Sequence, residues 1–392
     1  MAFAALWHLF VYCPLAHWVW APDGWMFQWG VLDFAGGTVV ETASGVTAFV
    51  LAFWLGKNHS ISNPLSSFIH PGEPNLWGPT LPHNVPYVLL GAGLLWFGWF
   101  GFNAGSALTA GNLAGRALVN THLAAAVGLG AWNVLEILLG SEEGYGKGKA
   151  TSVGAASGLI VGLVAITPAC GYVTAMWSMF IALFTTPIVY LGLKAIKASG
   201  VDDRLDVLGF HGISGMTGTA LVGLFASKDA GAPVNGAFYG GGADLFCKQL
   251  AAITVTITLC TIGTTIIYWF LQFVAVLLKT DLRVPREHQK DIDASQHGEK
   301  AYFTALQSLQ SVHARPAVIA AMPQENNSNS LSTHSAAISA ITKNNTENNS
   351  NPNTVVTVPS NLNLPSLSHE KSNTPPLPGN TMVSIVEVPK SL

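Results

Sequence analysis

Long apolar runs separated by short polar segments follow one another along residues 1–278. A helix that crosses a bilayer needs roughly 20 predominantly apolar residues. Eight runs approach that length, at residues 3–19, 34–55, 86–105, 117–139, 152–168, 173–193, 207–226 and 251–278. The pattern predicts an all-α polytopic membrane protein with about eight spans.

Many of these runs are rich in glycine and alanine, as in GAGLLWFGWFGFNAGSA at 91–107 and ATSVGAASGLIVGLVA at 150–165. Small residues let helix backbones approach closely, which is how helices associate when lipid removes the hydrophobic driving force. We therefore expect the spans to pack as a bundle within the bilayer.

The composition narrows the class of protein. Hydrophobic residues make up 49% of the chain and charged residues 10%, and the formal net charge of −3 does not favour a nucleic-acid partner. The four cysteines lack disulfide-type or metal-ligand spacing, so we expect neither a metal nor a cofactor; they are Cys13, Cys170, Cys247 and Cys260.

Basic residues in the loops predict the orientation, because Lys and Arg concentrate on the cytoplasmic side. One set of loops, with the segment after the last span, contains Lys57, Lys147, Lys149, Lys194, Lys197, Arg204, Lys279, Arg283 and Arg286. The opposite set contains only Arg116, Lys228 and Lys248. We expect both termini to be cytoplasmic and the membrane to be the plasma membrane.

The composition changes after the last span. Residues 279–303 are charged but varied, and are expected to form a short ordered cytoplasmic region. From Pro323 onward the chain is dominated by Asn, Ser, Thr and Pro, a composition that cannot bury enough apolar surface to fold. We predict a transporter domain at 1–278, the ordered region at 279–303 and a disordered tail at 304–392.

Two ionisable residues occupy matching places inside apolar spans. Glu41 begins E-x-x-S-G-x-T and His211, 170 residues later, begins H-x-x-S-G-x-T. An ionisable side chain in a span costs at least ~2.5 kcal/mol and commonly marks a substrate or proton pathway. The repetition favours a transporter with a polar pair near its midplane; a purely structural hydrogen bond between the helices is the alternative.

The order of the spans predicts an inverted repeat. An odd number of spans separates the Glu41 segment from the His211 segment, so the two should cross the membrane in opposite directions. If the second unit comprises the five spans between 86 and 226, the first should also have five, yet one span precedes that of Glu41. We therefore expect a chain short of about three N-terminal helices.

Acidic residues begin both of these spans, Asp33 in LDFAGGTVVE and Asp206 in LDVLGFH. Each could cap a helix N-terminus, and for Asp33 support of a cation site is an equal alternative. Glu41 lies about 12 Å deeper than Asp33 at 1.5 Å per residue.

Aromatic residues lie near the predicted external ends of two spans. Trp20 belongs to a tryptophan cluster typical of a membrane interface, although an indole face can also attract a small cation. Trp99, Phe102 and Ser106 lie near the end of a later span, where Phe102 could obstruct a path and Ser106 could accept a hydrogen bond from a substrate.

Several motifs, taken together, resemble the ammonium transporter family, which includes microbial and fungal ammonium permeases and the Rh proteins. The resemblance covers residues 1–303 and rests on LDFAGGTVVE (32–41), GWFGFNAGSA (98–107), TPACGY (167–172), DVLGFHG (206–212) and LRVPREHQKDIDASQHGEKAY (282–302).

The resemblance implies a homotrimer whose subunits each contain a pore, built from eleven spans in two inverted five-helix halves and a long final helix. It implies that Trp20 and Ser106 line the external cation site with Asp33 in support, that Phe102 is a gate phenylalanine and that Trp99 borders the vestibule. Glu41 and His211 occupy the positions of the pore's paired histidines. Most members have His where this chain has Glu41, and a subset of fungal permeases resembles this chain in having Glu there.

We therefore expect net ammonium uptake, in which the cation is recognised externally, loses its proton and crosses as ammonia while Glu41 and His211 relay the proton. One alternative is a truncated regulatory or sensor subunit that assembles with full-length transporters, as a heterotrimer. An intramembrane enzyme is a further alternative, but no serine or metal-ligand constellation accompanies the pair, and we expect no catalytic residues.

Overall fold

The computed structural model describes residues 1–56, 82, 84–141, 147–285, 288 and 293–299. Within this part of the chain every regular element is a helix, as the apolar pattern predicts. The principal helices are α1 (Ala2–Trp7), η1 (His8–Tyr12), α2 (Cys13–Trp20), α3 (Trp25–Trp29), η2 (Gly37–Thr42), α4 (Ala43–Leu55), α6 (Val85–Gly105), α7 (Asn112–Leu139), α8 (Ser152–Ile166), α9 (Ala175–Ser199), η3 (Leu208–Ile213), α10 (Ser214–Phe225) and α11 (Asp244–Leu277).

Seven helical segments of the described residues are long and apolar enough to cross a membrane, and α8 is a shorter apolar helix of 15 residues that ends at Ile166 rather than at 168. Together they correspond to the eight predicted apolar runs, so the predicted all-α polytopic fold with about eight spans is confirmed. Ten residues of α8 are buried, because this helix is enclosed by neighbouring helices. A helix surrounded by protein can be shorter than the bilayer, since other helices meet the lipid.

Backbone contact explains the glycine content of the α7–α8 pair. A Cβ added at Gly128 would lie 2.4 Å from the carbonyl oxygen of Gly158, and one at Gly162 would lie 2.2 Å from that of Ala124. Such distances are too short for any side chain, so the two helices touch through their backbones, as expected from small-residue packing.

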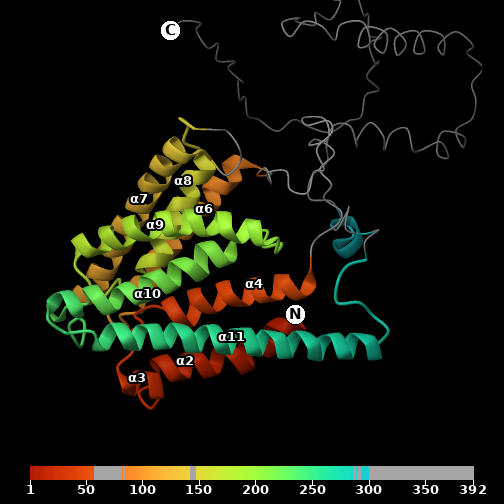
Figure 1. The fold of residues 1–392 in the computed structure, drawn as a ribbon, viewed down its shortest axis with the longest axis horizontal. Helices are drawn as coiled ribbons and strands as arrows, with labels where there is room; N and C mark the ends of the chain where they lie inside the picture. Colours follow the sequence, from red (N-terminus) through yellow and green to blue (C-terminus); the bar gives the residue numbers. More distant parts are fainter. Residues whose placement is uncertain (57–81, 83, 142–146, 286–287, 289–292, 300–392) are drawn as a thin grey trace, which may run out of the picture. The chain divides into compact units, whose positions relative to one another are not determined.

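The two matching segments cross each other in opposite directions. Gly45 approaches Gly212, whereas Thr42 approaches Gly215 and Gly37 approaches Thr219, so that one number rises as the other falls. Helix α4 packs against η3 and α10 packs against η2, and α11 contacts both α4 and α10 (Figure 1). This arrangement confirms the predicted inverted relation of the two segments.

The last helix begins earlier than its hydropathy predicts, at Asp244 rather than at 251. Asp244 and Lys248 form an ion pair one turn apart, 2.6 Å between Oδ2 and Nζ, and the buried Gln249 bonds the backbone of Leu32. A helix continues past the apolar run when its polar turn finds such partners.

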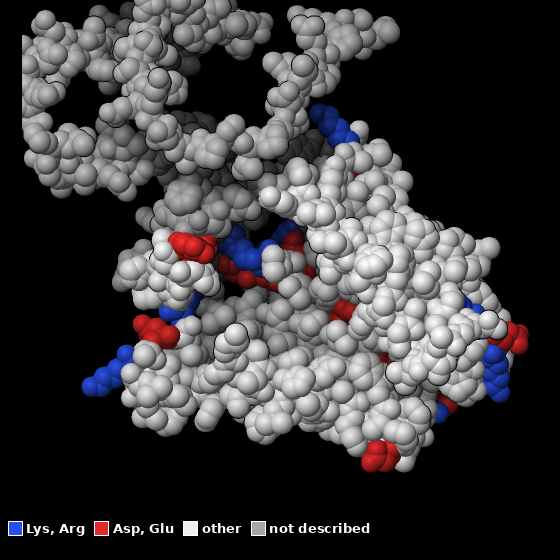
Figure 2. Space-filling view, turned by 180° about the vertical axis from the view of Figure 1, so that it is seen from behind, with Lys and Arg blue, Asp and Glu red and all other residues white. Residues whose placement is uncertain are grey.

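The outer surface suits contact with lipid, because large apolar side chains such as Phe97 and Phe273 are exposed along the helices. Figure 2 shows broad stretches of described surface without charged side chains, the charged ones gathering at edges and in a hollow. The short helix η7 (Asp293–His297) belongs to the predicted ordered region. The predicted tail at 304–392 lies outside the described residues, and the domain boundaries stay predictions.

Candidate functional site

Two π-helical segments carry the polar pair. Glu41 belongs to η2 and His211 to η3, and the two segments occupy corresponding positions of the repeat. Each follows a residue with positive φ, Gly36 at 119° and Asp206 at 53°, which are also 170 residues apart. Since π-turns within helices commonly occur at functional sites, their repetition marks this region of the fold.

Two aspartates cap these segments. Asp33 is buried and accepts hydrogen bonds from four backbone N–H groups, those of residues 36–39, and from the Thr38 hydroxyl, over distances of 2.5–3.3 Å. In the second segment, Asp203 Oδ2 accepts from Leu208 N at 2.9 Å, as Asp33 Oδ2 does from Thr38 N at 2.8 Å.

The expected capping role is observed at Asp33 and, in the second segment, at Asp203 rather than at Asp206. Asp203 lies 170 residues after Asp33, whereas Asp206 corresponds to Gly36 and pairs with Lys197, 3.4 Å from Oδ2 to Nζ. The sequence did not distinguish the two aspartates, because only the hydrogen bonds identify which carboxylate caps the helix.

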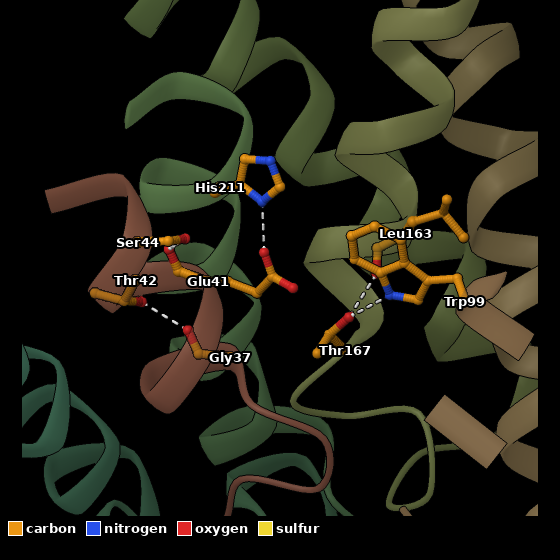
Figure 3. Close-up of polar contacts among 8 residues, drawn as sticks. All are labelled: Gly37, Glu41, Thr42, Ser44, Trp99, Leu163, Thr167 and His211. Atoms are coloured by element: carbon orange, nitrogen blue, oxygen red, sulfur yellow. Dashed lines mark hydrogen bonds and ion pairs between the residues drawn. The ribbon is translucent and has the colours of Figure 1, made fainter. Parts of the chain in front are cut away.

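The predicted pair meets across the crossing of the two helices. His211 Nδ1 lies 2.7 Å from Glu41 Oε2 (Figure 3). The Glu41 side chain is 2% exposed and that of His211 is 32% exposed. The contact occupies Nδ1 of the imidazole, and no hydrogen bond to Nε2 is found among the described residues.

A cavity of about 470 Å³ lies against this pair. Its remaining lining is largely apolar, and the lining residues are Val40, Glu41, Ser44, Leu94, Leu95, Gly98, Trp99, Phe102 and His211. The cavity thus combines one carboxylate and one imidazole with an otherwise apolar wall, a setting in which a small neutral molecule passes more easily than a hydrated ion.

Trp99 is fixed in the wall by its indole N–H, which donates to Thr167 Oγ1 at 2.9 Å, while Thr167 donates to Leu163 O (Figure 3). The Trp99 ring meets that of Phe102 edge to face, with centroids 5.6 Å apart. Trp99, predicted to border the vestibule, and Phe102, predicted to be a gate, thus lie together in the wall of the cavity that Glu41 and His211 also line.

The three remaining predicted residues lie outside this cavity. Trp20, 36% exposed, donates from Nε1 to the backbone oxygen of Asp33 at 2.9 Å. The Asp33 carboxylate is occupied by its capping donors, so the capping alternative describes it, and its support of Trp20 passes through the backbone carbonyl. Ser106, at the end of α6, donates to Phe102 O at 2.9 Å.

The other residues that line the cavity, or support its wall, differ in how far the sequence could have identified them. Ser44 belongs to the repeated S-G-x-T motif, and Thr167 opens TPACGY. Gly98 opens the motif GWFGFNAGSA. Leu94 and Leu95 carried no signal, because apolar residues within an apolar run do not show which of them face a cavity.

The repeat is symmetric in sequence but unequal in burial. Residues Ser214, Gly218, Leu221 and Phe225 are buried, and a Cβ at Gly218 would lie 2.1 Å from Ala165 O of α8. Their counterparts are partly exposed, namely Ser44, Ala48, Leu51 and Leu55. The cavity begins on this less covered face.

The sequence is similar to proteins of known family over most of its length. A sequence model described as Ammonium Transporter Family matches residues 1–302. An ammonium transporter of Bacillus subtilis is 41% identical over 308 residues, which cover 78% of this chain and 69% of that protein. An ammonium transporter of Aquifex aeolicus is 41% identical over 301 residues, covering 76% and 64%.

The crystal structure of Candida albicans Mep2 is similar with a TM-score of 0.62 and 32% identity, covering 72% of this chain and 59% of that one. A structure described as a sensor Amt protein has a TM-score of 0.59 and 28% identity, covering 72% and 65%. The chain thus spans about two thirds of the length of the relatives it matches.

Proposed function

Because this chain belongs to the ammonium transporter family, we propose that it transports ammonium across a membrane through the cavity beside Glu41 and His211. The observation that carries the proposal is the 2.7 Å contact between these two side chains at the wall of an otherwise apolar cavity. An apolar passage excludes charge, so a cation must release its proton to cross it.

Recognition is assigned to the end of the bundle at Trp20. An indole face attracts a small cation, and the Trp20 ring is oriented by its hydrogen bond to Asp33 O. Ser106 Oγ can accept a hydrogen bond from the cation while it donates to Phe102 O. Asp33 supports this site by fixing the segment that holds Trp20 in place.

Proton handling is assigned to Glu41 and His211, with Phe102 as the gate and Trp99 as a fixed wall. Ammonium and potassium ions are similar in size, but only ammonium can donate hydrogen bonds and lose a proton. The arrangement therefore selects ammonium over potassium by its ability to lose a proton rather than by its size. If the released proton crosses the membrane together with ammonia, one positive charge is carried for each molecule taken up.

The test is current recording from the full chain in planar bilayers or proteoliposomes. Ammonium should give a current at least tenfold above that of potassium, and His211→Ala should abolish it, whereas Lys149→Gln on an exposed loop should not. Equal ammonium and potassium currents would contradict the proposal.

A second candidate is a regulatory subunit that assembles with longer members of the family. It is favoured by the partly exposed face at Ser44, Ala48, Leu51 and Leu55, which an additional helix could cover as α8 covers α10. Growth at low ammonium of a strain lacking other ammonium transporters distinguishes the two: rescue by this chain alone supports transport. Altered uptake only in the presence of a co-expressed longer member supports the regulatory subunit.

The proposal includes the assembly, the membrane and the orientation of the protein. The functional assembly is a homotrimer, or a heterotrimer with related transporters. The membrane is the plasma membrane, and both termini face the cytoplasm, as the nine basic residues on that side favour.

A further inference from the structure

The cavity beside Glu41 and His211 has a third polar lining residue, Ser44, in the first turn of α4. Ser44 lies three residues after Glu41, which corresponds to a rise of about 4.5 Å along the helix. The indole of Trp20 bonds the backbone oxygen of Asp33, just before η2 begins. Ser44 is therefore further than Glu41 from the end of the bundle at which Trp20 lies.

The wall contributed by α6 extends in the same direction. The indole of Trp99 bonds Thr167 at 2.9 Å. The next residue, Pro168, accepts a hydrogen bond from the backbone N–H of Phe34 at 3.1 Å, just before η2 begins. Trp99 is therefore held near the level of η2, and the leucines at 94–95 precede it by about one turn of α6. The cavity continues past the polar pair between these leucines and Ser44.

The hydroxyl of Ser44 is the hydrogen-bonding side chain of this deeper part of the described lining. Its Oγ donates to Glu41 O at 3.0 Å, which uses its single proton (Figure 3). A hydroxyl oxygen that donates its proton keeps lone pairs that can accept a hydrogen bond. Ammonia has three N–H groups, so Ser44 can accept from an ammonia molecule that has passed Glu41 and His211.

The repeat provides a second serine for comparison. Ser214 lies 170 residues after Ser44, is fully buried and does not line the cavity. Its hydroxyl makes no hydrogen bond among the described residues, whereas Ser44 is partly exposed. The two serines have equivalent places in the sequence, but the fold brings only Ser44 to the cavity.

We propose, on the basis of the transport function proposed above, that the Ser44 hydroxyl binds ammonia after it leaves Glu41 and His211. A polar molecule in an apolar passage loses its hydrogen bonds to water, which costs free energy unless another partner replaces them. Ser44 supplies one such partner beyond the pair. It acts on the passage of ammonia rather than on recognition of the cation, which is assigned to the end of the bundle at Trp20.

The experiment measures the rate of ammonium uptake by the full chain in proteoliposomes over a range of concentrations. Ser44→Ala should lower the maximal rate roughly two- to tenfold, the factor that one hydrogen bond of ordinary strength contributes. The half-saturating concentration should not change, because recognition occurs elsewhere. Ser44→Thr retains a hydroxyl and should keep most of the rate, and Ser214→Ala should behave like the wild type.

The pH dependence of uptake separates binding of ammonia from positioning of the pair. Ser44→Ala also removes the hydrogen bond to Glu41 O. If Ser44 served only to orient Glu41, the pH profile would shift together with the rate. Binding of ammonia by the hydroxyl predicts a lower rate with an unchanged profile.

Thiol reactivity tests whether position 44 faces the passage. Cys13 and Cys247 are exposed and are first replaced by Ala and Ser. In that background Ser44→Cys should react with a small methanethiosulfonate reagent and lose transport. Ser214→Cys, the matched control, should not react.

Four results would each overturn the proposal: a wild-type rate in Ser44→Ala, an equal loss in Ser44→Thr or Ser214→Ala, a shifted pH profile, or an unreactive Ser44→Cys. Normal transport by the wild type together with any of them contradicts the Ser44 site alone. If the wild type carries no ammonium, the transport proposal fails and the Ser44 site fails with it.

Discussion

Asp33 and Asp203 stabilise the amino ends of the two helices that carry the polar pair, but their surroundings differ. Asp33 is buried with five donors around its carboxylate, whereas Asp203 is half-buried and accepts from Leu208 N. A buried donor that loses its acceptor cannot turn to water, so the same residue type contributes differently in the two halves.

Replacing Asp33 by alanine should lower the stability of the chain by at least ~3 kcal/mol, because several buried N–H groups lose their acceptor together. Asp203→Ala, the matched control, should cost only about 1 kcal/mol, a usual value for an accessible helix cap. Thermal unfolding in detergent provides the comparison. Equal losses for both variants would show that burial does not set the cost.

Replacing Glu41 by histidine should shift the pH dependence of uptake, because an imidazole takes up and releases its proton at a different pH from a carboxyl group. The Glu41 carboxylate contacts Nδ1 of His211, so the substitution changes the proton-binding partner of that imidazole. Uptake measured across a pH series is the readout.

Glu41→Gln is the companion variant, since it keeps the hydrogen bond but cannot titrate. It should reduce proton-coupled current strongly. If Glu41→His leaves the pH profile unchanged, Glu41 has only a structural role.

At the scale of elements, close helix crossings decide where the polar residues meet. Gly45 allows α4 to meet η3 at backbone distance, and Gly215 allows α10 to meet η2 in the same way, which brings Glu41 to His211. The α7–α8 pair uses the same device at Gly128 and Gly158. Here α8 holds Thr167 beneath Trp99, so this packing also positions the cavity wall.

Gly128→Ala should destabilise the protein by ~1–3 kcal/mol, because the new methyl group would lie 2.4 Å from Gly158 O and must push α8 away. Gly130→Ala, two residues along the same helix, meets nothing within 4 Å. It should be neutral or stabilising by up to ~1 kcal/mol, since alanine is the better helix former. Unfolding temperatures of the two variants, measured side by side, test the contrast; a stable Gly128→Ala would argue against backbone contact.

At the scale of the whole molecule, the two ends of the bundle differ. Trp20, the capped start of η2 and the cavity lined by Lys228 and Lys248 all lie where α2 and α10 end and α11 begins. The ends of α7 and α9 lie among the more numerous basic residues. The positive-inside rule favours the proposed orientation, in which the first end faces the exterior.

Cys247, exposed in the first turn of α11, should therefore react with a membrane-impermeant maleimide in intact cells that express a Cys13→Ala variant. With Cys247→Ser added, a cysteine introduced by Ser199→Cys at the end of α9 should react only after permeabilisation. The reverse pattern would invert the proposed orientation.

Letters alone were enough to predict which segments are helical and apolar, and which two ionisable residues would meet. Hydropathy is a property of each run, and the match of E-x-x-S-G-x-T with H-x-x-S-G-x-T is a comparison of letters, so neither needs coordinates. That comparison also predicted the opposed directions of the two segments, which the Gly45–Gly212 contact confirms.

The tertiary structure alone decided which atoms meet. Asp203 rather than Asp206 is the cap, α8 ends after 15 residues, and Leu94 and Leu95 face the cavity whereas Phe97 does not line it. The length of α8 and the cavity lining depend on distances between helices that are remote in sequence. The cap depends on a hydrogen bond for which the sequence offers two nearby candidates, Asp203 and Asp206. The amino-acid sequence does not contain these distances, because they are set by how the helices of the bundle pack against one another.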